Sequence, residues 1–190
     1  MTTRPGRSRS GTGTHVALLR AINVGGRNRL PMARLVGMFD EVGCQRVRTY
    51  IQSGNVVFDA SPALASRVPS LVSSLIASQM ALQVPIVTRT AAEFERIVSA
   101  NPFVDAGADT AIVYIGFLAD APTPTQIATL DPERSPPDEC VVHHRELYLR
   151  CPNGAARTKF TSAYLDRTFG TTTTVRNWRT TLALLDLIRS

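Results

Sequence analysis

The order of apolar segments in the first half of the chain restricts its possible folds more than any other feature. A buried strand is predicted over 15–24, followed by a helix that begins at Pro31 and ends at Gly43. The later patterns predict short strands over 46–52 and 55–60, an amphipathic helix over 64–76 and a strand over 82–89. This order of strand, helix, strand, strand, helix, strand is the ferredoxin-like βαββαβ pattern.

The second half repeats that order without useful sequence identity to the first. A linking helix over 91–100 leads into it. The elements that follow are a strand over 110–118, a helix near 124–130, a hairpin over 139–152, a helix around 159–169, a strand over 171–177 and a final helix over 178–188. We therefore expect an α+β fold of two tandem ferredoxin-like (βαββαβ) subdomains with a C-terminal helix. The first would span 15–90 and the second 91–190.

Residues 1–14 differ in composition from the rest of the chain, because they contain three arginines and no acidic residue. Such a segment cannot bury enough apolar surface to offset its ordering entropy, so we expect a disordered basic tail. The tail carries +3 of the formal net charge of +6, and the remaining 18 basic and 15 acidic residues leave the body only weakly basic. The high pI alone therefore does not indicate nucleic acid binding.

The sequence contains no feature of a membrane or secreted protein. No apolar run approaches the roughly 20 residues of a membrane helix, and no secretory signal is visible. Cys44, Cys140 and Cys151 are scattered and form no CxxC pair, which argues against a metal site or a disulfide framework. We expect a cytoplasmic protein with no cofactor, no metal and no membrane partner. The oligomeric state is not set by the sequence.

No arrangement of residues resembles a nucleophile with its base. His143 and His144 are adjacent on a predicted strand, so their side chains point to opposite faces and cannot act as a pair. The acidic residues form no pair that can be placed in a cleft. The sequence therefore names no catalytic residue and favours a protein without catalysis, although it leaves an enzyme open.

Three polar stretches lie at predicted strand ends and helix starts, and the first is "LLRAINVGGRNRLPM". Gly25 and Gly26 follow a strand and precede a helix, so their N–H groups can approach a phosphate or carboxylate closely. Asn23 and Asn28 would add donors. Arg20 ends the strand, where it either emerges as a bidentate anion clamp or meets an acid inside. The alternative is a tight loop with solvated arginines.

The second polar stretch is "TYIQSGNVVF", which surrounds the turn between two predicted strands. Turn chemistry explains Ser53 and, in part, Asn55, because both residue types are common in turns. It explains Gln52 less well. An amide both donates and accepts hydrogen bonds, so Gln52 suits the edge of a base as readily as an internal network.

The third stretch, "TTTTVRNWRT", runs from a strand into the last helix. Asn177 is a good N-cap, whereas Arg176 beside it opposes the helix dipole unless an anion is bound there. Trp178 is either a core residue or a stacking platform. Nearby, Lys159 is the only lysine among 21 basic residues, and its compact ammonium could contact phosphate or act as a base. Chance could equally leave one lysine.

On the motifs "ALLRAINVGGRNRLPM", "TYIQSGNVVF" and "TKFT…TTTVRNWRT", the chain resembles a bacterial family catalogued as domain of unknown function 1697. The resemblance covers residues 15 to 190, which is nearly everything except the tail. It implies an α+β fold with two small subdomains of ferredoxin-like character, and a cytoplasmic bacterial protein. It implies no activity, substrate or catalytic residue.

We expect a module that binds a nucleotide-like or single-stranded nucleic acid ligand in a cleft between the subdomains, because ferredoxin-like sheets commonly bind RNA. The expected ligand-binding residues are Arg20, Asn23, Gly25, Gly26, Asn28, Gln52, Ser53, Asn55, Lys159, Arg176 and Asn177. One alternative is an enzyme acting on a small phosphorylated or carboxylated substrate, with Lys159 as its base. Another is a structural module that contacts a macromolecule, in which these residues satisfy one another between the subdomains.

Overall fold

The computed structural model of the chain describes residues 11–25 and 28–190, and its first half forms a four-stranded sheet with helices. The elements of this first unit are β1 (Gly13–Leu19), α1 (Met32–Glu41), β2 (Gln45–Tyr50), β3 (Asn55–Ala60), α2 (Pro62–Ala65), α3 (Val68–Met80) and β4 (Ile86–Thr90). The strand order is β2-β3-β1-β4, and all neighbouring strands are antiparallel.

The first unit differs from the sequence expectation at three places. β1 begins at Gly13 and ends at Leu19, so the expected strand over 20–24 is wrong. Positive φ angles at Ala21 and Asn23 turn the chain into a loop there. The single helix expected over 64–76 is divided into α2 and α3, and Pro69 lies in the first turn of α3, where its missing N–H is tolerated. The expected tail over 1–14 is wrong at its end, because Gly13 and Thr14 belong to β1, and residues 1–10 lie outside the described residues.

The second unit contains the other four-stranded sheet. Its elements are α4 (Ala91–Ser99), α5 (Pro102–Asp105), a 3₁₀ turn (Thr110–Ile112), β5 (Val113–Leu118), α6 (Pro124–Ala128), β6 (Glu139–His143), β7 (Glu146–Arg150), α7 (Ser162–Phe169), β8 (Thr173–Asn177) and α8 (Trp178–Arg189). The strand order is β6-β7-β5-β8, again antiparallel throughout. Within the described residues, no helix is long and apolar enough to cross a bilayer.

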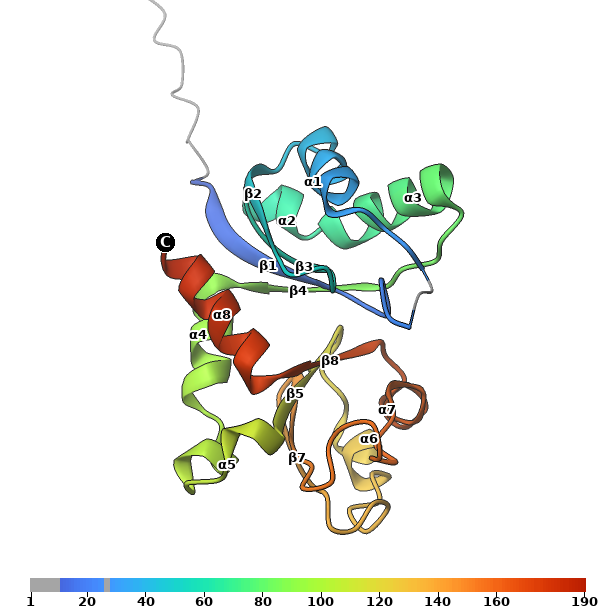
Figure 1. Cartoon of the computed structure of the whole chain (residues 1–190), viewed down its shortest axis with the longest axis vertical. Coiled ribbons are helices and arrows are strands. Elements are labelled where there is room, and N and C mark those ends of the chain that lie inside the picture. Colours follow the sequence, from blue (N-terminus) through green and yellow to red (C-terminus); the bar gives the residue numbers. More distant parts are fainter. Residues whose placement is uncertain (1–10, 26–27) are drawn as a thin grey trace, which may run out of the picture.

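The two sheets share one central core. Figure 1 shows the first sheet above the second, with α1, α2 and α3 on the far side of the first, and α6 and α7 beside the second. The helices α4 and α8 lie side by side and contact both units. The shared core contains Leu18 and Val57 from the first sheet, Phe117 from the second, Phe94 from α4 and Trp178 from α8. Trp178 is therefore a core residue.

β1 is apolar from Val16 to Leu19 because both of its faces are covered there. Ala17 and Leu19 point into the core under α1 and α3, whereas Val16 and Leu18 point into the core shared with the second unit. The side-chain alternation of a strand produces this division. An uninterrupted apolar strand in an antiparallel sheet therefore marks a sheet that is buried on both faces.

The turn between β2 and β3 is built tightly against the end of β1. Gly54 has a φ of +71°, and a Cβ atom there would lie 2.6 Å from Cβ of Leu19 and 2.8 Å from the side chain of Ile22. The Gly54 carbonyl also accepts a 2.8 Å hydrogen bond from the Leu19 N–H. Only glycine fits this position, because it provides both the left-handed backbone and the missing side chain.

Replacement of Gly54 by alanine should therefore destabilise the protein strongly. We expect Gly54→Ala to cost about 2–4 kcal/mol in urea unfolding, from backbone strain and overpacking together. The matched control is Gly25→Ala, because Gly25 also has a positive φ but a Cβ atom added to it would meet nothing within 4 Å. Equal costs for the two variants would show that contact with Leu19 and Ile22 contributes nothing.

Candidate functional site

Arg176 reaches from β8 to the first sheet and is the centre of the polar motif residues. Its guanidinium donates to Oδ1 of Asn55 and to the backbone carbonyls of Leu19 (2.7 Å) and Ser53 (3.4 Å). Two further hydrogen bonds go to neighbours on its own strand. These five bonds match the five N–H groups of the side chain, and all the acceptors are neutral. Burial lowers the pKa of Arg176 to about 10.

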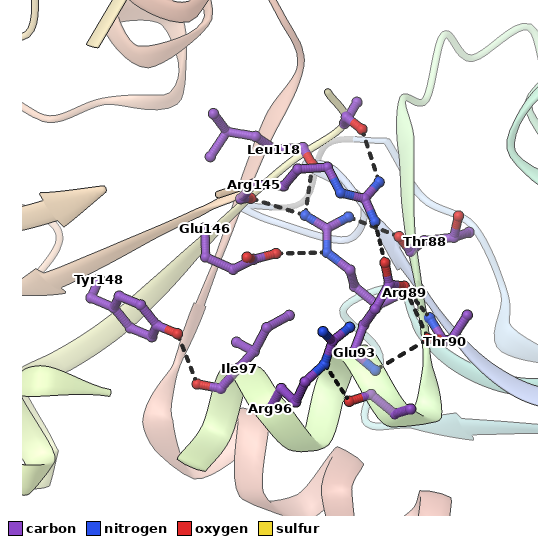
Figure 2. A network of polar contacts seen from close by, with 12 residues as sticks. Thr88, Arg89, Thr90, Glu93, Arg96, Ile97, Leu118, Arg145, Glu146 and Tyr148 are labelled. Atoms are coloured by element: carbon purple, nitrogen blue, oxygen red, sulfur yellow. Dashed lines mark hydrogen bonds and ion pairs between the residues drawn. The ribbon is translucent and has the colours of Figure 1, made fainter. Parts of the chain in front are cut away.

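Arg89 makes the reverse connection, from β4 into the second sheet (Figure 2). Its Nε donates to the carboxylate of Glu146 at 2.8 Å, and its Nη2 donates to the carbonyls of Leu118 (2.7 Å) and Arg145 (2.9 Å). Arg89 is only 2% exposed, so desolvation lowers its pKa, against the attraction of Glu146. A buried cation of this kind depends on its carboxylate partner.

The two arginines occupy equivalent positions in the two units. Each is the fourth residue of a five-residue strand, and each stands one residue before a helix N-cap. Thr90 caps α4 through the backbone N–H of its third residue, and Asn177 caps α8 in the same way. The two units therefore match in the strand, in the position of the arginine within it, in the N-cap and in the helix that follows.

The partners of the two arginines are equivalent as well. Asn55 begins β3 and Glu146 begins β7, and each lies opposite the penultimate residue of the first strand of its unit. The carbonyls of Leu19 and Leu118, the last residues of those first strands, each accept from an arginine Nη2. We call the contacts of Arg89 with Glu146 and of Arg176 with Asn55 the reciprocal arginine contacts. One of them is charged and the other neutral.

Arg89 and Glu146 were not among the residues expected from the sequence, although a signal for Arg89 is present. Both halves contain a short strand whose arginine precedes a Thr or Asn cap, in "VTRTAAEF" and "TVRNWRTT". Comparison of these two segments would have selected Arg89 as the counterpart of Arg176. The charged partner Glu146 has no such signal, because its counterpart in the first half is an asparagine.

Asn23 fixes the loop after β1 to the turn between β2 and β3. Its Nδ2 donates to the carbonyls of Leu30 (2.9 Å) and Gln52 (2.8 Å), and its Oδ1 accepts from the Leu30 N–H at 2.9 Å. Asn28 closes the same loop by donating to the carbonyl of Ala21 at 2.9 Å. These amides therefore shape the loop, with both N–H groups of Asn23 already in use.

Asn55 performs a similar task inside the turn. It is fully buried, its Oδ1 accepts from Arg176, and its Nδ2 donates to Oγ of Ser53 at 2.8 Å and to the carbonyl of Tyr50 at 3.3 Å. Ser53 in turn offers its carbonyl to Arg176. The structure thus brings Ser53, Asn55 and Arg176 together, and they satisfy one another between the two sheets.

The remaining expected residues have separate environments. Arg20 forms an ion pair with Asp166 on α7, which is the second of its two alternatives and another link between the units. Asn177 is the expected N-cap of α8. Gly25 is exposed with a φ of +58°, whereas Gly26 lies outside the described residues.

Lys159 lies in the exposed loop between β7 and α7. Its backbone accepts a hydrogen bond from Arg134 and donates one to Ser135. Across the described residues, no hydrogen bond joins Lys159 to the reciprocal arginine contacts or to the loop of Asn23. The side chain of Lys159 is exposed and forms no hydrogen bond or ion pair with any described residue, so the geometry offers no support for a catalytic base there.

An open groove of about 490 Å³ lies beside this network, on the first unit alone. It is lined by Asn23, Arg29, Leu30, Pro31, Met32 and Gln52. Two exposed apolar residues adjoin the lining in sequence, Val24 (63% exposed) and Ile51 (54% exposed). From the sequence we expected a cleft between subdomains, but the junction near these motifs is filled by the contacts of Arg176.

The described part of the chain has no arrangement of residues suited to metal binding or to thiol chemistry. No group of three His, Cys, Asp or Glu residues there is arranged to hold a metal ion. Cys44, Cys140 and Cys151 are free, and burial raises the pKa of each thiol to about 11. These thiols are therefore protonated at neutral pH and weakly nucleophilic.

The fold and contacts define a two-sheet α+β protein in which each sheet receives an arginine from the other. The chain belongs to the family described as "Protein of unknown function (DUF1697)", whose model matches residues 13–148. No curated protein was found to match the sequence. The structure is similar to that of the conserved bacterial protein SP0830 from Streptococcus pneumoniae, with 19% identity, a TM-score of 0.72, and 94% of this chain and 99% of that chain covered. At this identity the similarity shows the fold alone.

The two reciprocal arginine contacts should differ in their contribution to stability. Glu146→Ala leaves the buried charge of Arg89 without its counterion, and we expect a loss of about 3–5 kcal/mol. Asn55→Ala leaves one N–H of Arg176 without an acceptor, with an expected loss of about 1–3 kcal/mol. Urea unfolding of the two variants measures both values.

The control for this comparison is Glu139→Ala, which removes a carboxylate from the exposed pair with Arg150 on the same sheet. Exposed ion pairs contribute about 0–1 kcal/mol, so this variant should stay close to the parent. A cost for Glu146→Ala no larger than that for Glu139→Ala would mean that Arg89 does not depend on its carboxylate.

Proposed function

We propose that the groove beside Asn23 and Gln52 binds a nucleotide-like anion, either a free mononucleotide or a unit of a single-stranded nucleic acid. The observation that carries this proposal is a division among the polar motif residues. Asn23, Asn55 and Arg176 have their side-chain donors occupied by protein acceptors, and Asn28 donates to the carbonyl of Ala21, whereas Arg29 and Gln52 at the groove make no side-chain hydrogen bond within the described residues. The residues with occupied donors hold the loop and the turn in place. The residues with free donors, Arg29 and Gln52, are available to bind a ligand at the groove.

The free groups match the parts of a nucleotide. Within the described residues, the side chains of Arg29 and Gln52 make no hydrogen bond, and both are exposed at the groove. A guanidinium suits phosphate, and a primary amide can pair with the edge of a base because it both donates and accepts. The open Gly25 allows a ligand to approach the backbone closely.

Exposed apolar side chains at the same place supply a surface for the base. Val24 and Ile51 are among the few large apolar residues that the fold leaves exposed. Pro31 and Met32, at the start of α1, also line the groove. A base has an apolar face and a polar edge, so a surface that joins apolar side chains to Gln52 is complementary to it.

Backbone strain at the turn also supports a functional role. Ile51 has a φ of +48°, which is unfavourable for a β-branched residue. Asn23 holds the next carbonyl, that of Gln52, and so keeps the turn in this conformation. Strain that surrounding contacts maintain is concentrated at functional sites. The strained turn displays Ile51 and Gln52 together.

We further infer that each unit, 15–90 and 91–190, is a ferredoxin-like βαββαβ fold. The strand orders β2-β3-β1-β4 and β6-β7-β5-β8, with antiparallel neighbours throughout, support this inference. A cytoplasmic location is supported by the three free thiols. The groove lies at the edge of the first unit rather than on an open sheet face, since both faces of that sheet are covered.

A titration with mononucleotides and a fluorescent single-stranded octanucleotide at low salt tests the proposed function. We expect Arg29→Ala to weaken binding about tenfold, because it removes a charge-assisted hydrogen bond. For the octanucleotide it should also reduce the slope of log K against log salt by about 0.7. Gln52→Ala should weaken binding of both ligands with little effect on that slope.

The matched control is Arg157→Ala, which removes an exposed arginine of the second unit. An equal loss of affinity in Arg29→Ala and Arg157→Ala would mean that net charge alone causes the loss. It would contradict the proposal that the groove is the binding site. Binding of the octanucleotide but not of mononucleotides would identify the single strand as the ligand, and tighter binding of a mononucleotide would identify the free nucleotide.

A further inference from the structure

A second hollow lies between α4 and the turn that joins β6 to β7, and it has a volume of about 410 Å³. Its lining includes Arg96 and Ile97 on α4, and His143, His144 and Tyr148 from the β6–β7 hairpin. Figure 2 shows Arg96 extending from α4 toward the space that Glu146 and Tyr148 border. This size falls within the range of pockets that hold small organic ligands.

The charges around the hollow leave a cation in excess. Glu93 is paired with Arg145, and Glu146 is paired with the buried Arg89, so both carboxylates that line the hollow are neutralised. Arg96 has no carboxylate within bonding distance among the described residues. Only its Nε is engaged, with the carbonyl one turn earlier on α4 at 3.3 Å. Both terminal nitrogens of Arg96 are therefore free to bind an anion.

Two imidazoles stand opposite this arginine. His143 ends β6 and His144 begins the turn, with their ring centroids 4.4 Å apart and their planes at 72°. The expectation that the two side chains point to opposite faces is wrong, because a φ of +53° at His144 ends the strand alternation there. Both residues are exposed, and their side chains form no hydrogen bond in the described structure. They can donate N–H groups to a shared ligand.

The equivalent place in the other half provides an internal comparison. A hollow of about 540 Å³ lies between α8 and the end of β2, and Tyr50, Ala183 and Asp186 contribute to it. By strand register and helix start, Tyr50 corresponds to His143, and Ala183 corresponds to Arg96. The two halves therefore share the hollow, but the arginine and histidine at these positions occur only in the one beside α4.

We infer that the hollow beside α4 is a binding site for a small organic phosphate or carboxylate. Arg96 binds the anionic group with its two free terminal nitrogens, and His143 and His144 donate to it from the other side. Ile97 and the ring of Tyr148, whose hydroxyl donates to the Ile97 carbonyl at 3.0 Å, contact the organic part. The site is separate from the groove of Arg29 and stands independently of the function proposed there.

The experiment uses the full chain and phenyl phosphate, benzoate and inorganic phosphate as probes, followed by calorimetry and by amide shifts in ¹⁵N spectra. We expect phenyl phosphate and benzoate to shift the amides of Ala100, His144 and Arg145, and phenyl phosphate to bind several-fold more tightly than inorganic phosphate. Arg96→Ala should weaken binding about tenfold or more. His143→Ala should weaken it less.

Arg29→Ala is the control here, because it should leave binding in this hollow unchanged, and Arg96→Ala should leave nucleotide binding in the groove unchanged, so either site can fail without the other. Arg96 is exposed and outside the buried network, so its replacement should leave the urea midpoint unchanged. Unchanged affinity in Arg96→Ala, shifts dispersed over the surface, or equal affinity for inorganic and phenyl phosphate would each overturn the assignment.

Discussion

Burial of an arginine from each sheet against the other is the interaction on which the arrangement of the two units depends. A guanidinium loses much hydration energy on burial, and it is stable there only when its N–H groups find acceptors. Arg89 and Arg176 find most of theirs on the opposite unit, at carbonyls that end β1 and β5 and at the first side chains of β3 and β7. Sliding one sheet past the other would break both sets of bonds together.

The same contacts determine what the polar motifs can do. Asn55 and Ser53 accept and donate hydrogen bonds within the junction between the sheets. Asn23 joins the loop before α1 to the same turn through its hydrogen bond to the carbonyl of Gln52. The hydrogen-bonding capacity of these residues is used for positioning. What these contacts leave free is therefore informative, because Arg29, Gln52 and Arg96 are exposed donors beside residues whose own hydrogen bonds are made within the protein.

The sequence predicted the order of the elements well, because apolar periodicity depends on burial and both sheets are buried on regular faces. It predicted the N-cap at Asn177 from local pattern as well, whereas it left two alternatives for Trp178, of which the structure shows the core position. It did not predict which polar residues pair. Arg20 with Asp166, and Arg89 with Glu146, join residues 146 and 57 positions apart, and no local pattern encodes such a meeting.

The reciprocal contacts also place a condition on how the chain assembles during its synthesis. Every acceptor that Arg89 finds outside its own strand, at Leu118, Arg145 and Glu146, is translated later than Arg89 itself. The first sheet can pair its strands while this guanidinium is still hydrated. Closure of the two halves must wait for the ribosome to release β7, and dehydration of the arginine belongs to that late docking step rather than to formation of the first sheet.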